Sequence, residues 1–318
     1  MTQRSNGMST RVSVIIPEFQ DLRAANAAHA MLAQTLPAEV ALEIIIVDDA
    51  SGQDIVQRLR SGLPPLVQLI ELTENLGRGG AAQAGIAAAS GEFILLLDSD
   101  CEPVGPNFLV SHLEQMTQDV VASVGPITGI DGDFWDFYQR RLSSRRRDRF
   151  LQGETFVGTT SNIMMRSWAL REVGGFDLRY RRYGFEDRDL LIRLSAVGKI
   201  SWCDDAVVRH MDRLTLVGVS KKMRTAGRES SRLFAIQHPS EYRALGYASV
   251  DARIHPCLRF PGRLLGNFVD HMARIFDALQ GRGLVPWVLG LPIVKTVSAI
   301  SYLAGTSEAV ARDAYTLE

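Results

Sequence analysis

The chain has 318 residues, of which 46% are hydrophobic and 22% are charged, with a formal net charge of −1. These values are close to those of average soluble globular proteins, so they exclude disordered, collagen-like and coiled-coil classes. They also give no reason to expect nucleic acid as a partner.

The cysteines and the N-terminal residues indicate a cytoplasmic location. The three cysteines are widely spaced and form no CxxC pair, which argues against a zinc site or a redox dithiol. Residues 1–10 are polar and lack the apolar core of a secretory signal. We therefore expect a disordered leader over 1–10 and a cytoplasmic protein.

Apolar runs alternate with helix-forming stretches through the first hundred residues. The pattern predicts strands at 12–16, 42–47, 66–72 and 92–97, and helices at 22–34, 53–61 and 79–89. Because the strands are continuously apolar and alternate with helices, we expect an α/β fold with a mostly parallel sheet covered on both faces.

The second half of the chain is less regular. Strand character returns at 120–127, 156–165 and 207–210, an arginine-rich helix or loop covers 135–150, and a helix is expected at 187–197. No repeat or low-complexity linker separates the halves, so we expect one catalytic domain over 11–215.

Polar residues follow several of the predicted strands. In parallel sheets ligands bind beyond the carboxyl ends of the strands. Asp98-Ser99-Asp100 follows a six-residue apolar strand, and alternate carboxylates suit a divalent cation, Mg²⁺ or Mn²⁺, with its diphosphate. Asp48 and Asp49 end another strand, where they either accept hydrogen bonds from a nucleoside or cap the next helix.

The glycine-rich segment from Asn75 to Gly85 leaves a second class of enzyme open. Gly77-x-Gly79-x-x-Ala82 formally matches a dinucleotide fingerprint, so an NAD(P)-dependent oxidoreductase is an alternative. The segment follows the third strand rather than the first, and four residues, Thr73 to Leu76, intervene, which both count against that interpretation.

Two acidic residues begin the helix predicted near 187. Glu186 and Asp187 either stabilise the helix start or deprotonate an acceptor hydroxyl. His210, at the end of a short strand, is either a metal ligand or a structural histidine.

These motifs together resemble family 2 glycosyltransferases, which have the GT-A fold with a Rossmann-like sheet. The resemblance covers about Val12 to His210 and rests on motifs that occur in order: residues 12–17, 46–51, 75–85, 93–100, 174–177 and 185–187.

The resemblance implies a role for each matching residue. The nucleotide-sugar donor would be bound by Pro17, Glu18, Phe19, Asp48, Asp49, Asn75, Gly77, Arg78, Asp98 and Ser99. The metal would be held by Asp100, with Asp98 and His210 as further ligands. Asp187 would be the catalytic base, and Glu186 would help to hold the acceptor.

The implied activity is a metal-dependent, inverting transfer of a sugar to a hydroxyl acceptor. UDP-sugars are the commonest donors in that family, and glycosylation of a polysaccharide, a lipid-linked glycan or a natural product is expected. Gln83 and Glu18-Phe19-Gln20 depart from the usual pattern, which affects donor identity. The Gln-x-x-Arg-Trp motif of processive members is absent, so single transfers are expected. A non-catalytic nucleotide-sugar-binding protein is a further alternative.

Residues 216–318 lie beyond the resemblance, and we expect a mainly helical extension. Pro292 and Lys295 interrupt its apolar stretch at 284–303, which argues against a membrane-spanning helix. Two interpretations are left: peripheral contact with the inner face of the cell membrane, or packing that includes a homodimer interface. For the membrane we expect Trp287 and Tyr302 as anchors, with basic residues at Arg263, Arg274 and Arg282.

Overall fold

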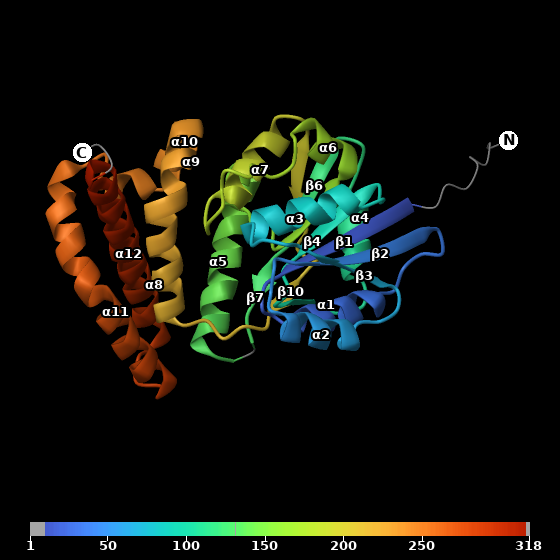
Figure 1. The fold of residues 1–318 in the computed structure, drawn as a ribbon, viewed down its shortest axis with the longest axis horizontal. Helices are drawn as coiled ribbons and strands as arrows, with labels where there is room; N and C mark the ends of the chain where they lie inside the picture. The colour runs from blue at the N-terminus through green and yellow to red at the C-terminus, as the bar shows by residue number, and fades with distance from the viewer. Residues whose placement is uncertain (1–9, 131, 316–318) are drawn as a thin grey trace. The chain divides into compact units, whose positions relative to one another are not determined.

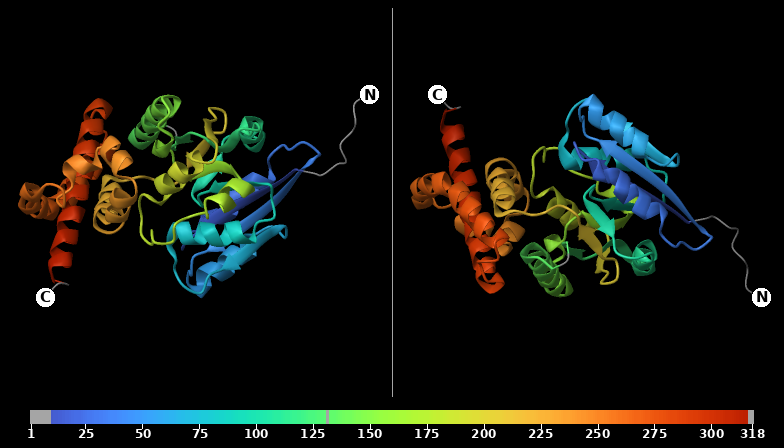
Figure 2. Two further views of the ribbon diagram at one scale, coloured as in Figure 1. Left: turned by 90° about the horizontal axis from the view of Figure 1, so that it is seen from above. Right: turned by 90° about the horizontal axis from the view of Figure 1, so that it is seen from below.

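The computed structural model describes residues 10–130 and 132–315, which form two compact units (Figures 1 and 2). The first unit contains the described residues up to Thr128 together with Ser143–Asp177 and Leu190–Met211. The second contains the described residues of Gly129–Leu142, Leu178–Asp189 and the chain from Asp212 onward. Two segments of the stretch expected as one domain, 11–215, thus group with the C-terminal residues. Of the expected leader, residues 1–9 lie outside the described residues, and Thr10 begins the first strand.

A seven-stranded sheet forms the centre of the first unit, with the order β3-β2-β1-β4-β8-β6-β9. Its strands are β1 (Thr10–Glu18), β2 (Val40–Asp48), β3 (Val67–Glu71), β4 (Phe93–Leu97), β6 (Val120–Val124), β8 (Asn162–Arg166) and β9 (Lys199–Trp202). The neighbours β3, β2, β1 and β4 are parallel, and β6 is parallel to β9, whereas β8 runs antiparallel to β4 and β6. The expected mostly parallel sheet is confirmed.

Helices cover both faces of this sheet, as the unbroken apolar strands predicted. They are α1 (Arg23–Leu32), α2 (Gln53–Gly62), α3 (Gly77–Ala88), α4 (Phe108–Gln115) and α6 (Ser167–Glu172), with the C-terminal parts of α5 (Phe134–Leu151) and α7 (Glu186–Ser195). One buried cluster joins the sheet to α1, α2 and α4, and another joins it to α3, α5, α6 and α7. Figure 1 shows α1 and α2 on the side of the sheet opposite to α3.

A small second sheet continues from the carboxyl edge of the large one. Its strands are β5 (Cys101–Pro103), β10 (Val208–His210) and β7 (Ile127–Thr128), in that order. The expected strand at 120–127 therefore breaks into β6 and β7, because Gly125 and Pro126 intervene. The expected strand at 156–165 is shorter than predicted: Thr155–Val157 forms a 3-10 turn, and the strand begins at Asn162.

The second unit is helical, as expected. It contains α8 (Leu216–Thr225), a π-turn at Ala226–Ser230, α9 (Ser231–Gln237), α10 (Pro239–Ala244), 3-10 turns at Tyr247–Val250 and Pro256–Leu258, α11 (Arg259–Gly281) and α12 (Trp287–Tyr315). The longest helix, α12, packs against α8 and α11. Small residues allow these helices to approach closely: a Cβ on Gly266 of α11 would lie 2.8 Å from the Cβ of Ala304.

The C-terminal helix corrects two expectations. It continues through Pro292, so the expected interruption is wrong, and within the described residues Trp287–Val310 is long and apolar enough to cross a membrane. However, 44% of its most apolar window is buried inside the protein. Tyr302, expected as a membrane anchor, is fully buried, and its hydroxyl lies 2.5 Å from that of Tyr242. A ring held in the interior of the unit has no access to lipid.

Candidate functional site

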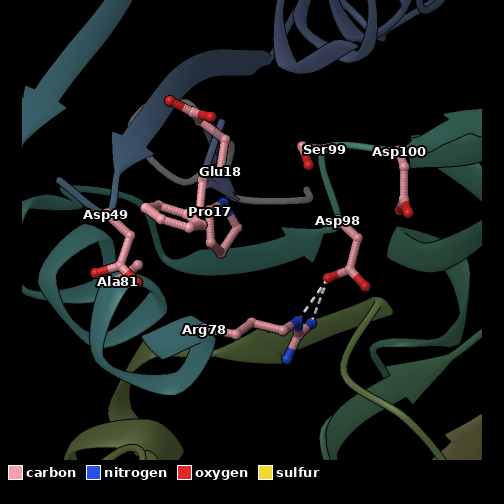
Figure 3. Close-up of a pocket in the computed structure, with 9 residues that line it drawn as sticks. Pro17, Glu18, Asp49, Arg78, Ala81, Asp98, Ser99 and Asp100 are labelled. Carbon is pink, nitrogen blue, oxygen red and sulfur yellow. Dashed lines mark hydrogen bonds and ion pairs between the residues drawn. The ribbon is translucent and has the colours of Figure 1, made fainter. Parts of the chain in front are cut away.

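A cavity of about 200 Å³ lies at the carboxyl ends of β1, β2 and β4, where the topology predicts a ligand (Figure 3). It is lined by Pro17, Glu18, Phe19, Asp49, Arg78, Ala81, Asp98, Ser99 and Asp100. The structure thus brings eight of the predicted site residues together around one space.

The end of β1 contributes an apolar wall and an unusual carboxyl group. Pro17 and Glu18 still pair with β2, while Phe19 follows the strand and is half-exposed. Glu18 is buried and lies opposite Asp48 in the strand register. Burial, together with the hydrogen bond and the charge of Asp48, raises the pKa of Glu18 to about 8. Glu18 therefore carries a proton at neutral pH.

The two aspartates that end β2 have different surroundings. Asp48 is buried and accepts hydrogen bonds from the backbone N–H of Ser51, so its side chain holds the turn after the strand. Asp49 lines the cavity and accepts the N–H of Leu76 at 2.7 Å. Burial outweighs the backbone donors and raises the pKa of Asp49. Asp49, rather than Asp48, is therefore placed to accept a hydrogen bond from a ligand.

The turn that begins α3 is built from Asn75 and Gly77. The Asn75 amide donates to the carbonyl of Asp49 at 3.1 Å, so it ties this turn to the end of β2. Gly77 has a φ of +77°, in the left-handed region that glycine adopts without strain. Asn75 and Gly77 therefore shape the loop, and the next residue, Arg78, is the one whose side chain enters the cavity.

Arg78 and Asp98 form an ion pair inside the cavity. The Nε of Arg78 lies 2.7 Å from Oδ1 of Asp98, and its Nη1 donates to Thr160 at 2.7 Å. Figure 3 shows the two charged groups pointing toward one another. Burial raises the pKa of Asp98, but the Arg78 guanidinium outweighs it and holds that pKa below its usual value. Asp98 is therefore ionised and already neutralised by a cation.

The next two residues turn to other partners. Ser99 donates from its hydroxyl to Asp21 at 3.0 Å. Asp100 lies beside His210, with Oδ2 of the carboxylate 3.2 Å from Nε2 of the imidazole. The pairing of β10 with β5 brings these two residues together, because His210 is opposite Cys101.

The donor groups of the predicted metal site are only partly assembled. Asp100 and His210 offer an oxygen and a nitrogen donor within reach of one ion, which fits a divalent cation. Asp98 instead faces Arg78. Among the described residues no group of three or more His, Cys, Asp or Glu side chains is arranged to hold a metal.

Glu186 and Asp187 belong to the second unit, at the start of α7. Glu186 is buried and accepts the N–H of Gly184 at 2.9 Å, and Asp189 is buried and bonded to His238 Nε2 at 2.9 Å. Asp187 is partly exposed. Of the three carboxylates in the first turn, Asp187 is therefore the one with access to a substrate.

The residue before these carboxylates was not singled out from the sequence. Phe185 has a φ of +73°, which is rare for a residue with a side chain. Its ring is stacked on Phe234 at 4.7 Å between centroids and contacts Tyr247 at 5.0 Å. Packing therefore maintains a strained backbone where α7 begins, which is typical of functional sites. A helix-period pattern gives no signal for such a conformation.

Two further polar links were also missed. Gln83 of α3 accepts the N–H of Phe176 at 2.9 Å, which joins α3 to the Gly174–Asp177 motif. His112 is fully buried between Ser123 and the Oδ1 of Asn162, each 2.9 Å from a ring nitrogen. Both links connect residues far apart in the chain, so no local pattern could have indicated them.

Comparison with known proteins relates the chain to a family of enzymes. The model of glycosyl transferase family 2 matches residues 13–174, slightly more than half of the chain. An uncharacterised glycosyltransferase of Nostoc is 36% identical over 128 residues, which are 39% of this chain and 38% of that protein.

A longer match is weaker in identity. The pre-mycofactocin glycosyltransferase of Mycobacterium tuberculosis is 27% identical over 210 residues, 63% of this chain and 44% of that protein. The chain thus spans less than half of the length of these two curated relatives.

One solved structure is similar over nearly the whole chain. The mannosyltransferase PcManGT from Pyrobaculum calidifontis, in complex with GDP-Man and Mn²⁺, aligns with a TM-score of 0.57 and 17% identity. The alignment covers 94% of this chain and 86% of that one. At this identity the similarity is one of fold.

Proposed function

The chain belongs to glycosyltransferase family 2, and from that membership we propose that it transfers a single sugar from a nucleoside diphosphate sugar to a hydroxyl acceptor, with inversion at the anomeric carbon. The resemblance stated from the motifs is confirmed by the family match. The expected GT-A fold is confirmed by the mostly parallel sheet and by the solved mannosyltransferase.

The cavity at the carboxyl ends of β1, β2 and β4 is the observation that carries the proposal. It combines apolar surface from Pro17 with an acceptor for base N–H groups in Asp49 and a cation in Arg78. A nucleoside diphosphate needs these three kinds of group, for its base, its hydrogen bonds and its charge. We propose a UDP-sugar as the donor, and the GDP-Man of the solved mannosyltransferase makes GDP the second nucleotide to test.

Asp100 and His210 are the proposed ligands of a divalent cation. Such an ion neutralises the charge that develops on a departing nucleoside diphosphate. A carboxylate oxygen suits both Mg²⁺ and Mn²⁺, but Mg²⁺ strongly prefers oxygen donors, so the imidazole nitrogen favours Mn²⁺. The Mn²⁺ in the structure of PcManGT supports the same choice.

Asp187 is the proposed general base. A base must have contact with the acceptor hydroxyl that it deprotonates. In the first turn of α7, Glu186 and Asp189 are buried and bonded to Gly184 and His238, whereas Asp187 is partly exposed. Glu186 would hold the acceptor loop in place through its bond to Gly184.

The oxidoreductase alternative loses its support. The glycine-rich segment begins α3 after the third strand of the chain, and its first glycine, Gly77, forms the loop that presents Arg78. The family match covers the same segment. A non-catalytic binding protein is the outcome that the following experiment separates from an enzyme.

The test is binding of UDP and GDP by calorimetry with and without Mn²⁺, followed by nucleotide release from UDP- and GDP-sugars. We expect Mn²⁺-dependent binding. Asp187→Asn should bind the nucleotide like the wild type but lower turnover by a factor on the order of 10² to 10⁴. Asp205→Asn, which removes an exposed acid in the first unit, is the matched control.

Two results would count against the proposal. Absence of nucleotide binding under all metal conditions would exclude the donor site. Tight nucleotide binding with no turnover in the wild type, on any donor sugar with water or a hydroxyl acceptor, would favour the non-catalytic binding protein.

A further inference from the structure

Helix α11 carries apolar side chains on two faces. On one face Val269, Ala273 and Phe276 are buried within the second unit, where they pack with Val294 and Val297 of α12. This face accounts for the role of α11 in the core of the unit.

The other face of α11 is an exposed apolar stripe. Its side chains recur at intervals of three or four residues, so they line one side of the helix. They are Phe260, Leu264, Phe268, Met272, Ile275 and Leu279, with exposures from 37% for Leu279 to 75% for Phe260. A helix that is apolar on both faces is typical of one covered by a partner or by lipid.

The apolar surface continues into the turn between α11 and α12. Leu284, Trp287, Val288 and Leu289 are exposed there, and Val288 is as exposed as Phe260. Tryptophan is enriched where a protein meets the interface between water and lipid. The stripe and this turn form one extended apolar surface on consecutive residues of the chain.

The exposed charges on this surface are all positive. Between residues 259 and 295, a stretch that the structure describes completely, the exposed charged side chains are Arg259, Arg263, Arg274, Arg282 and Lys295. The two acids of α11 have partners inside the unit: Asp270 pairs with Arg224 at 3.7 Å, and Asp277 accepts the N–H groups of Leu216 and Val217.

Basic residues also flank the apolar stripe directly. Arg263 and Arg274 precede Leu264 and Ile275, so both are rotated by ~100° to the same side of the helix axis. An apolar face edged by arginines is the pattern of helices that lie in the surface of an anionic membrane.

We propose that α11 and the first turns of α12 lie on an anionic phospholipid surface, with the stripe in the acyl boundary and the basic residues among the headgroups. A twofold dimer would place this surface against itself, and with it five cations against five cations without a nearby exposed acid. Charge complementarity therefore favours lipid over a second copy.

A spanning α12 fits the structure less well. Its central part is buried by protein and carries polar contacts to the rest of the unit, including Ser301 to Ser220 at 2.7 Å and Tyr302 to Tyr242 at 2.5 Å. Crossing a bilayer would require this helix to leave its partners, whereas surface binding leaves the unit intact.

The test is co-sedimentation of the full chain with phosphatidylcholine vesicles, with and without phosphatidylglycerol. We expect binding only to the anionic vesicles, falling as salt is added. Arg263→Gln combined with Arg274→Gln should weaken binding about 25-fold, at about fivefold for each charge. Leu264→Ser combined with Phe268→Ser should weaken it on the order of tenfold or more.

Matched controls change equally exposed residues of the first unit. They are Arg58→Gln with Arg145→Gln, and Leu66→Ser with Leu151→Ser, and they should bind like the wild type. Thermal unfolding shows whether each variant is folded. The proposal is overturned if no vesicle is bound at low salt, if stripe and control variants bind alike, or if ultracentrifugation shows a dimer that the stripe variants dissociate. These readouts involve no sugar transfer, so they are independent of the proposed activity.

Discussion

Arg78 Nε lies 2.7 Å from Asp98 Oδ1, so the first carboxylate of Asp98-Ser99-Asp100 is occupied by a guanidinium while the third residue faces His210. The two aspartates are separated by one residue, yet they carry different partners. This difference divides the consequences of mutation at the two positions.

Removal of Arg78 should destabilise the protein through Asp98. Arg78→Ala leaves a largely buried carboxylate without its cation, which we expect to lower the free energy of unfolding by about 2 kcal/mol, less than for a fully buried pair. Urea unfolding measures this effect. Asp98→Asn combined with Arg78→Ala should recover most of the loss, and strictly additive effects in this double-mutant cycle would contradict the coupling.

Loss of either proposed metal ligand should weaken Mn²⁺ binding. Changes to groups that merely orient ligands typically cost 10- to 100-fold in affinity, so Asp100→Asn and His210→Gln should each cost about 100-fold. Calorimetry with Mn²⁺ and UDP tests this. His255→Gln, at an exposed histidine of the second unit, is the control. Wild-type affinity in both ligand variants would place the cation elsewhere.

Glu18 should make the protein less stable as the pH rises. Its pKa is about 8 in the folded protein against 4.5 for the free side chain, so the folded state binds more protons between these values. The stabilising contribution is complete below pH 4.5 and is lost as the pH rises through about 8. Glu18→Gln should therefore raise the melting temperature relative to the wild type at alkaline pH and leave it unchanged near pH 4.5. Parallel melting curves across this range would contradict the assignment.

His112 should have the opposite dependence on pH. Burial lowers its pKa from 6.5 to about 4, against the hydrogen bond to Asn162, so the unfolded state binds the proton first as the pH falls. Its contribution is complete above pH 6.5 and is lost toward pH 4, about 3 kcal/mol at 1.36 kcal/mol per pH unit. Unfolding in urea at several pH values measures the slope. His112→Gln should flatten it, and an unchanged slope would exclude His112 as the cause.

The sheet and the location of the site could be predicted from the sequence because their signals are local. The continuously apolar strands β1, β2 and β4 each lead into a polar residue, and parallel strands bring those ends to one edge. That reasoning placed Asp49 and Asp98 correctly at the cavity without any information on tertiary contacts.

The roles within the site depend on distant contacts and could not be read from the chain. Glu186, Asp187 and Asp189 are equivalent as first-turn acids, and only His238, 49 residues after Asp189, distinguishes them in the folded protein. Asp48 follows the same pattern as Asp49, but its side chain turns back to Ser51. Tertiary contacts, rather than residue type, decide which carboxylate meets a ligand.

The link between α3 and the Gly174–Asp177 motif has a consequence for how such sequences diverge. Gly175 has a φ of +67°, and a Cβ at this position would collide with the amide of Gln83, which holds the N–H of Phe176. A larger residue at 175 therefore becomes acceptable only after position 83 has shortened, and the shorter side chain gives up the bond. The two positions, 92 residues apart in the chain, should thus evolve as one character, and the helix that presents Arg78 depends on both.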